Sequence, residues 1–170
     1  MAEIFTKDDI LVYGNYGLCR MVGIKNTSFV SGVPKQDYYT LVPLSNGAST
    51  YYVPVENEKA VSKLRFPLSE EQIKTMLTES KGRDIQWIEN RQLRSDTFGE
   101  ILRKGVSSEL VALVSCFRFR EETLSQQGKS ISTTDEIIFN SARELLFEEI
   151  SYGLGIEKDK AEEYIAAFLS

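Results

Sequence analysis

The sequence predicts an α+β fold in which a small β-rich module is followed by an all-α domain. Residues 1–66 contain short β-rich runs separated by turn residues, and helical periodicity is weak there. From Pro67 onward, apolar residues recur at helical spacing, and capping residues mark helix ends. A chain of 170 residues is long enough for two small domains. We therefore expect one domain at residues 1–66 and a second at residues 67–170.

The expected strands of the first domain are separated by recognisable turns. They are Ile10–Tyr13, Gly17–Thr27, Asp37–Pro43 and Ser49–Val55. Asn46-Gly47 predicts a hairpin between the last two strands because both residues tolerate a positive φ angle. Ser31–Pro34 marks another turn. Four or five short strands in roughly sixty residues indicate a small, strongly bent sheet or a barrel.

The first helices of the second domain are expected between clear start and stop residues. Ser69 is a suitable N-cap for a helix that runs to about Ser80. A short helical piece is expected from about Ser95 to Lys104, and it ends near Gly105. Ser107 is the expected cap of a long apolar helix, whose stripe is Leu110, Val114 and Phe117.

Two further helices are expected between Thr133 and the C-terminal end of the sequence. Thr133 and Glu136 form a capping-box pair at the start of the first of them. This helix carries the apolar stripe Phe139, Ala142, Leu146 and Ile150. It is expected to end near Gly153 or Gly155, and Lys158–Leu169 forms the last helix.

Trp87, the only tryptophan, lies in the segment 84–94, which the apolar spacing predicts to be helical. The apolar face of this helix would hold Ile85, Ile88 and Leu93. Trp87, Arg91 and Arg94 would share the opposite face, at i, i+4 and i+7. An aromatic ring beside two guanidinium groups is suited to stacking on bases and pairing with phosphates. The alternative is an ordinary packed tryptophan at the joint between the two domains.

Composition disfavours an enzyme. The chain contains no histidine, which removes the commonest general base and metal ligand. Tyr13–Gly17 contains glycines, but turns between two strands explain them better than a phosphate loop. Cys19 and Cys116 have no metal-like spacing and are expected to be reduced and buried. We expect no cofactor and no bound metal, although carboxylate-based catalysis is an open alternative.

Charge and hydropathy restrict the location and the mode of binding. A formal net charge of −5 argues against a protein that coats nucleic acid by bulk charge. No apolar run approaches the ~20 residues that a membrane span needs. The N-terminus lacks the pattern of a signal peptide, so a cytoplasmic protein without membrane contact is expected.

The first domain is rich in tyrosine, with Tyr13, Tyr16, Tyr38, Tyr39, Tyr51 and Tyr52. Tyr51 and Tyr52 are adjacent in an expected strand, so one should face the core and the other solvent. An exposed tyrosine is a common residue of protein contacts. Ordinary β-propensity is the alternative explanation for this composition.

Four motifs, taken in order, resemble the CarD/CdnL family of bacterial transcription regulators. Residues 10–17 are similar to the valine-tyrosine-proline…glycine opening of the family. Residues 52–57 match its valine-proline-x-x-asparagine signature. Trp87 falls where the family carries an exposed tryptophan in its helical domain, and residues 141–146 resemble the alanine-arginine core of its penultimate helix. The resemblance covers nearly the whole chain.

The resemblance implies a fold and a function. The first domain would be a Tudor-like module, similar to an SH3-like β-barrel, that binds the β-subunit lobe of bacterial RNA polymerase. Its contact residues would be Ser49, Thr50, Tyr51, Tyr52 and Thr27. Trp87 would wedge into the minor groove at the upstream edge of the promoter bubble and stabilise the open complex. It would recognise DNA structure with little reading of base sequence, and the protein would act as a monomer.

The chain departs from the family pattern at three places. Ile88, Glu89 and Asn90 follow Trp87 where basic residues are frequent, and Tyr51-Tyr52 occupy strand positions that are often basic. Gly14 stands where proline is usual. DNA contact would therefore rest on Arg91, Arg94, Lys81 and Arg83 together with Trp87. The runner-up function is a polymerase-tethered adaptor whose helical domain recruits another protein through Trp87.

Overall fold

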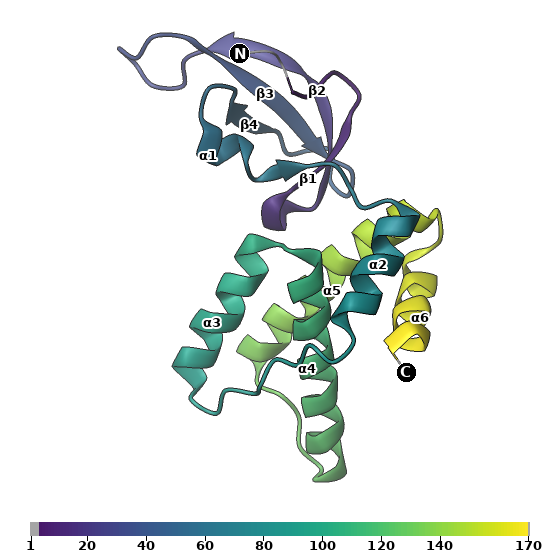
Figure 1. The fold of residues 1–170 in the computed structure, drawn as a ribbon. Helices are drawn as coiled ribbons and strands as arrows, with labels where there is room; N and C mark the ends of the chain where they lie inside the picture. The colour runs from purple at the N-terminus through teal and green to yellow at the C-terminus, as the bar shows by residue number, and fades with distance from the viewer. Residues whose placement is uncertain (1–3, 170) are drawn as a thin grey trace. The chain divides into compact units, whose positions relative to one another are not determined.

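A computed structural model describes residues 4–169 of the chain. The described residues fall into two compact units, whose boundary in the sequence lies between Pro67 and Leu68. We call the first the β module and the second the helical unit. An antiparallel sheet in the first unit is followed by a unit of helices, which confirms the predicted α+β class (Figure 1).

The β module is built on one five-stranded antiparallel sheet. Its strands are β1 (Ile10–Tyr13), β2 (Leu18–Thr27), β3 (Gln36–Pro43), β4 (Tyr51–Pro54) and β5 (Leu64–Arg65). Their order in the sheet is β4-β3-β2-β1-β5. A 3₁₀ turn (Gly14–Tyr16) joins β1 to β2, and the short helix α1 (Glu58–Val61) precedes β5. The sequence did not predict α1 or β5, because both are too short to show a periodic pattern.

The sheet is open in the described part of the chain. β4 and β5 are its two edges, and neither pairs with the other, so the expected barrel closure is not confirmed. The pairing of β2 with β3 shifts register between Met21 and Gly23, which marks a β-bulge. Gly23 has a φ angle of 153° there. A bulge of this kind bends a strand and increases its twist, in keeping with the bent sheet that was expected.

The two hairpin loops differ in how well the sequence predicted them. β3 and β4 pair as expected, but residues 44–50 form a longer loop between them. The predicted hairpin of β3 and β4 is therefore confirmed, but neither Asn46 nor Gly47 has the positive φ angle on which the prediction was based. The Asn46 Oδ1 atom instead accepts a hydrogen bond from the Ala48 N–H at 3.1 Å, a local alternative to a tight turn. The predicted turn in the β2–β3 loop is confirmed by Gly32, whose φ angle is 82°.

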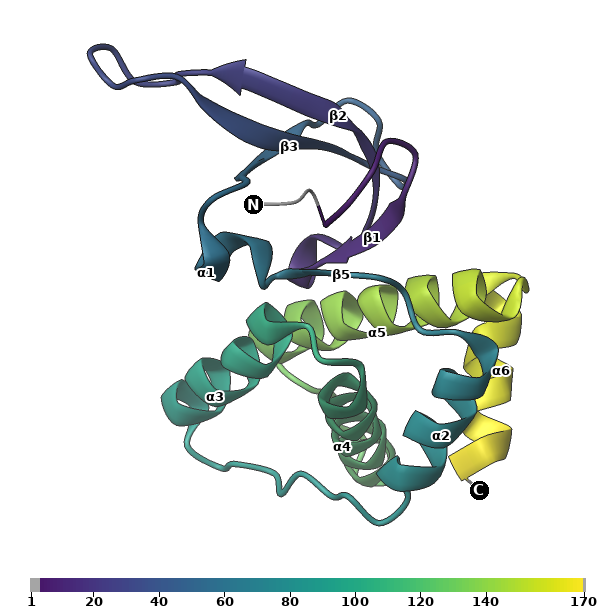
Figure 2. The same cartoon turned by 45° about the horizontal axis from the view of Figure 1, so that its top comes forward.

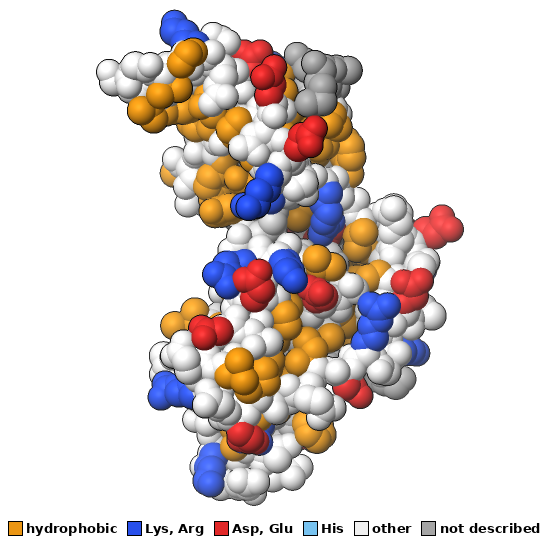
Figure 3. All heavy atoms as spheres, turned by 60° about the vertical axis from the view of Figure 1, so that its left-hand side comes forward, with side chains coloured by type: hydrophobic (Ala, Val, Ile, Leu, Met, Phe, Trp, Pro, Cys, Tyr) orange, Lys and Arg blue, Asp and Glu red, His pale blue; other side chains and the backbone are white. Residues whose placement is uncertain are grey.

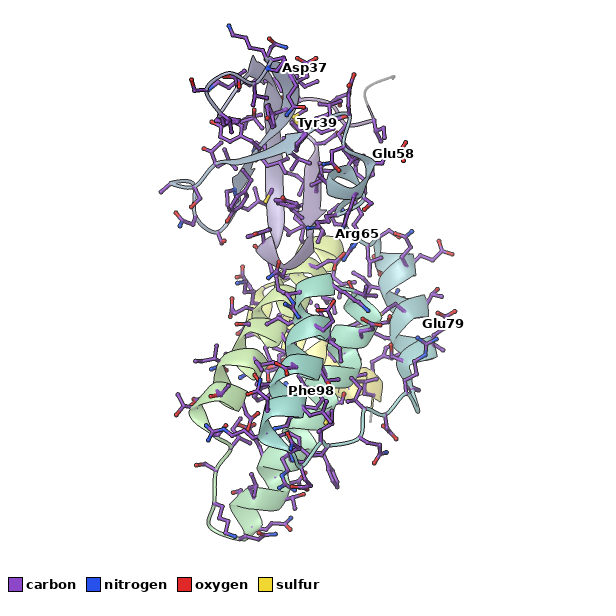
Figure 4. All side chains as sticks on the ribbon, turned by 90° about the vertical axis from the view of Figure 1, so that its left-hand side faces the viewer. Asp37, Tyr39, Glu58, Arg65, Glu79 and Phe98 are labelled. Carbon is purple, nitrogen blue, oxygen red and sulfur yellow. The ribbon has the colours of Figure 1, made fainter. Side chains whose placement is uncertain are left out.

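The core of the β module lies on one face of the sheet. Its fully buried side chains are Leu11, Cys19, Met21, Tyr39, Leu41 and Val53. Phe5 covers this core and meets Tyr39 edge-on, with ring centroids 5.6 Å apart. Figure 4 labels Tyr39 among the strands. Cys19 is buried, as expected, and its thiol donates a hydrogen bond to the Gly17 carbonyl oxygen at 3.7 Å.

The described part of the helical unit, residues 68–169, contains five helices. They are α2 (Glu70–Ser80), α3 (Arg91–Lys104), α4 (Ser107–Gln126), α5 (Thr133–Leu154) and α6 (Lys158–Leu169). The two longest, α4 and α5, contact each other, and the other three helices pack around them (Figure 2). Among residues 4–169, no helix combines the length and the apolar character needed to span a bilayer.

Local capping explains where most of these helices begin. Ser69 caps α2 as predicted, and Gln72 completes a capping box with it. The predicted caps of the two long helices are each wrong by one residue. Ser132 rather than Thr133 caps α5, and its hydroxyl accepts from the Asp135 N–H. Ser107 is the first residue of α4, and Val106 occupies its cap position without a side-chain bond.

Buried Glu149 links three separate segments of the helical unit. Its Oε2 atom accepts a hydrogen bond from the Ser107 hydroxyl at 2.6 Å. Its Oε1 atom accepts from the Leu68 N–H at 3.0 Å. Ser107 is therefore needed for this contact rather than for capping, which is the physical reason for the wrong prediction.

The C-terminal end of α5 resolves the choice between two glycines. Gly155 is the C-cap, with a left-handed φ angle of 65°. Gly153 lies within the helix, where an added Cβ atom would come within 2.5 Å of the Leu68 carbonyl oxygen. Gly153 is thus required by close packing, and Gly155 by backbone conformation.

The predicted helix at residues 84–94 does not form. Residues 81–90 lie outside any helix, and α3 begins only at Arg91. The Asn90 side chain accepts a hydrogen bond from the Leu93 N–H at 2.9 Å and so acts as an N-cap. Ser95 lies inside α3, so the short helix predicted to start there begins four residues earlier, at Arg91.

Candidate functional site

Trp87 lies in the loop between α2 and α3 and is half-buried. Its indole meets Phe98 and Phe117 edge-on, with centroid distances of 5.9 and 5.7 Å. Phe98 is fully buried in the helical unit, where Figure 4 labels it. The expectation of a tryptophan pointing away from the core is wrong, because the loop turns the ring toward these two rings. The remaining part of its surface stays accessible to solvent.

Arg94 does not share an exposed face with Trp87. Its side chain is only 8% exposed and forms a two-pronged ion pair with Asp135. The Nε atom donates to Asp135 Oδ1 at 2.9 Å, and an Nη atom donates to Oδ2 at 2.8 Å. The other Nη atom donates to the carbonyl oxygens of Ile88 and Glu89. Arg94 therefore holds the loop around Trp87, and its guanidinium is not free to bind a phosphate.

Hydrogen bonding shifts the pKa values of Arg94 and Asp135 in opposite directions. The hydrogen bond to Asp135 raises the pKa of Arg94 above its ordinary value. Burial by itself would raise the pKa of Asp135, but hydrogen bonds from Arg94 and Ser132 outweigh burial and lower it. Both groups are therefore charged at neutral pH, and each needs the other to remain buried.

A second arginine, Arg120 on α4, lies over the Trp87 ring. Its guanidinium carbon is 5.0 Å from the ring centroid, and that of Arg94 is 4.5 Å away. Arg120 is also 3.7 Å from Glu89, but its Nε atom is buried without a hydrogen-bond partner. The sequence did not indicate Arg120, since it lies on another helix and no local spacing connects it to Trp87.

A cavity of about 360 Å³ adjoins Trp87 between the loop and α4. It is lined by Asp84, Ile85, Gln86, Trp87, Ala112, Ser115, Cys116, Phe119, Arg120 and Thr123. Cys116 is partly buried, less than expected, and burial raises the pKa of its thiol. Phe119 is 74% exposed at this cavity. The cavity thus offers aromatic, apolar and cationic groups next to the accessible part of Trp87.

The other three basic residues predicted to bind DNA are exposed. Lys81 and Arg83 lie in the same loop as Trp87, and Arg91 is the first residue of α3. The Lys81 ammonium lies 5.2 Å from the centroid of the Phe168 ring. These three cations can reach a phosphate without breaking a buried contact, in contrast to Arg94.

The two adjacent tyrosines of β4 point to opposite faces of the sheet, as predicted. Tyr51 packs against the core face, where its ring lies 4.8 Å from that of Tyr16 and 5.7 Å from that of Tyr13. Burial, followed by repulsion from Tyr16, raises the pKa of Tyr13. Tyr51 is therefore engaged in a cluster of three rings, and only part of its side chain is accessible.

Tyr52 lies on the other face of the sheet, which we call the outer face. Its ring centroid is 4.7 Å from that of Phe29 and 6.4 Å from that of Tyr38. Thr27 shares the outer face, since it lies two residues beyond Lys25, the cross-strand partner of Tyr38. Lys25 itself approaches the Tyr52 ring at 5.5 Å. The structure thus places Thr27 and Tyr52, two of the residues predicted to bind polymerase, on the same face of the sheet.

The remaining two predicted residues lie beside the sheet edge. Ser49 and Thr50 belong to the loop that leads into β4. Because β4 is an edge strand, one side of its backbone has no partner strand among residues 4–169. An open edge with an adjacent aromatic face is a typical arrangement for protein binding. Phe29, which contacts Tyr52, was not predicted because it lies in a loop with no strand pattern.

An open five-stranded sheet with an aromatic outer face and an accessible edge is typical of a protein-interaction module. Residues 5–65 match the family model of the CarD-like/TRCF RID domain. The β module is therefore an RNA polymerase-interacting domain of the CarD-like family, which confirms the resemblance for this part of the chain. The matched segment ends before the helical unit. No curated protein sequence matches the chain.

Proposed function

We propose that the protein is a transcription regulator that binds the β-subunit lobe of RNA polymerase and stabilises the open promoter complex. The match of residues 5–65 to the RID family carries this proposal. The β module would act as the Tudor-like module of the family, although its sheet is open. The contact surface would comprise the β4 edge and the outer face around Tyr52 and Thr27.

The helical unit would bring Trp87 to the upstream edge of the promoter bubble. The ring is fixed by Phe98 and Phe117 on its buried side, so inserting its accessible part would cost little conformational entropy. An apolar wedge at an unstacked base step opposes closure of the duplex. Lys81, Arg83 and Arg91 are exposed cations that would hold the neighbouring phosphates.

The mechanism would be differential binding to two states of the promoter. A protein that binds the open complex more tightly than the closed complex shifts the equilibrium by the ratio of the two affinities. Tethering through the β module raises the local concentration of Trp87 at the DNA, so modest direct DNA affinity is sufficient. This agrees with an overall formal charge of −5, which is unfavourable for binding DNA without a tether.

The decisive experiment substitutes Trp87 in the full chain and measures the lifetime of open complexes formed by purified polymerase holoenzyme. We expect Trp87→Ala to bind polymerase as the wild type does and to lose the stabilising effect on the open complex. Tyr152→Ala is the matched control, because Tyr152 is an exposed aromatic residue of α5 that does not line the cavity beside Trp87. Full activity of Trp87→Ala would contradict the wedge.

One observation favours an adaptor as a second candidate. Phe119 is highly exposed at the cavity, and Glu121 and Glu122 are exposed on the same helix, where they disfavour phosphates. A protein partner docked at this cavity would make activity depend on Phe119. In that case Phe119→Ser would abolish regulation in cell extract but leave the effect on open complexes made from purified components unchanged.

A further inference from the structure

The β2–β3 hairpin ends in an exposed apolar tip, which we define as Phe29, Val30 and Val33. Their side chains are 54%, 62% and 49% exposed. The hairpin extends beyond the other strands of its sheet in both ribbon views (Figure 1 and Figure 2). Hydrophobic side chains are visible on the surface of the β module in Figure 3. Apolar side chains gathered at one projecting point are typical of a surface that another molecule covers.

Hydrogen bonds within the loop order the backbone that carries these side chains. The Val33 N–H donates to the Val30 carbonyl oxygen at 3.2 Å, which closes a four-residue turn. Gly32 occupies the third position of this turn with a φ angle of 82°, a conformation that favours glycine. The Ser28 hydroxyl also donates to the Val30 carbonyl oxygen, at 2.8 Å. An ordered loop loses little entropy when it binds, so its apolar area is available for affinity.

The tip is continuous with the surface assigned to polymerase. Phe29 meets the Tyr38 ring edge-on at 5.0 Å and lies 4.7 Å from the Tyr52 ring. Phe29 also follows Thr27 by only two residues. One aromatic surface therefore extends from the β4 edge, across the outer face, to the end of the hairpin.

Few polar or charged side chains accompany the apolar tip at the end of the hairpin. The cations that flank it in the sequence are Lys25, which lies over the Tyr52 ring, and Lys35, which follows the loop. Polar groups at the base of the hairpin bond to each other, as Asn26 Nδ2 does to Asp37 Oδ1 at 2.7 Å. The end of the hairpin therefore offers a partner mainly aromatic and aliphatic groups, which favour an apolar depression.

We propose that the tip inserts into an apolar depression on the RNA polymerase β subunit and is the main anchor of the complex. This rests on the proposed function, and it adds residues that the sequence did not indicate. The partner follows from the RID match, which includes the hairpin, and from the continuity of the tip with Tyr52. Phe29 is the central residue of this anchor because it joins the tip to the outer face.

The test measures the affinity of the full chain for purified core RNA polymerase. Phe29→Ser should weaken binding about tenfold or more, and Val30→Ser about threefold, as expected for central contacts of an interface. Val22→Ser is the matched control, since Val22 is an exposed valine of β2 near the bulge, away from the tip. It should change the affinity less than about twofold. Circular dichroism of each variant should match the wild type, because these side chains are exposed.

The outcomes separate the two proposals. If the wild type does not bind polymerase, the proposed function fails, and the anchor fails with it. If the wild type binds and Phe29→Ser binds equally well, only the anchor is overturned. Dimerisation of the wild type that Phe29→Ser abolishes, with polymerase affinity unchanged, would also overturn it and assign the tip to a second copy of the chain.

Discussion

The two units hold their accessible aromatic side chains in opposite ways. In the β module, Phe29 lies on Tyr38 and Tyr52 above the outer face of a sheet whose core is on the other side. In the helical unit, Trp87 packs directly against the buried core cluster, and two arginines lie over its ring. The first surface lies on the face of the sheet opposite its core, whereas the second is a half-buried ring packed against its core.

This difference has a consequence for how each surface can work. Residues of the hairpin tip can change with little effect on folding, so their effects on binding can be measured cleanly. Trp87 cannot be removed without loss of packing between the loop and α4. A ring that is fixed by its own core is, in return, a rigid contact, and this rigidity is what a wedge requires.

Arg94→Ala should cause the largest loss in the free energy of unfolding. A small loss would contradict the view that the surroundings of Trp87 are part of the folded core. Removing one member of a buried ion pair leaves Asp135 charged and unpaired, which costs about 3–5 kcal/mol. It also releases the carbonyl groups of Ile88 and Glu89 and thereby loosens the loop around Trp87. Urea unfolding followed by circular dichroism measures the change. Arg91→Ala, on the exposed first turn of the same helix, should stay within about 0.5 kcal/mol.

Trp87→Ala should lower the free energy of unfolding by about 2 kcal/mol, since the ring is half-buried against two phenylalanines. Phe29→Ser should lower it by about 1 kcal/mol or less, because only ring contacts at the surface are lost. Thermal unfolding of both variants would measure this contrast. Equal losses would show that the hairpin tip is as structural as Trp87, and the distinction between the two surfaces would not hold.

The parts of the fold that the sequence predicted correctly are specified by local chemistry. Ser69 caps α2 because its side chain reaches an N–H three residues away. Gly155 ends α5 because the left-handed backbone conformation favours glycine. The alternation of Tyr51 and Tyr52 follows from the two-residue period of a strand. In each case the deciding interaction lies within a few residues of the one that reveals it.

The environment of Trp87 was not predictable, because distant contacts decide it. The prediction that Trp87, Arg91 and Arg94 share a face assumed that Trp87 lies in a helix. The helix begins only after Trp87, because Asn90 caps its N-terminus. Arg94 is turned inward by Asp135, which is 41 positions away in the sequence. Arg120 arrives from another helix altogether. Periodicity places a side chain on a face, but it does not show which distant charge or ring will bury that face.

Arg91→Gln should give the smallest effect, and it refines the assignment of charges around Trp87. Of the two arginines first grouped with Trp87, only Arg91 is exposed, so only Arg91 can release a counterion on binding a phosphate. We expect the slope of log affinity against log salt, measured with promoter DNA, to become shallower by about 0.9. Arg103→Gln is the control, because Arg103 lies on the last turn of α3 and is paired with Glu100. An equal change in both variants would indicate a general charge effect and would remove Arg91 from the contact surface of Trp87.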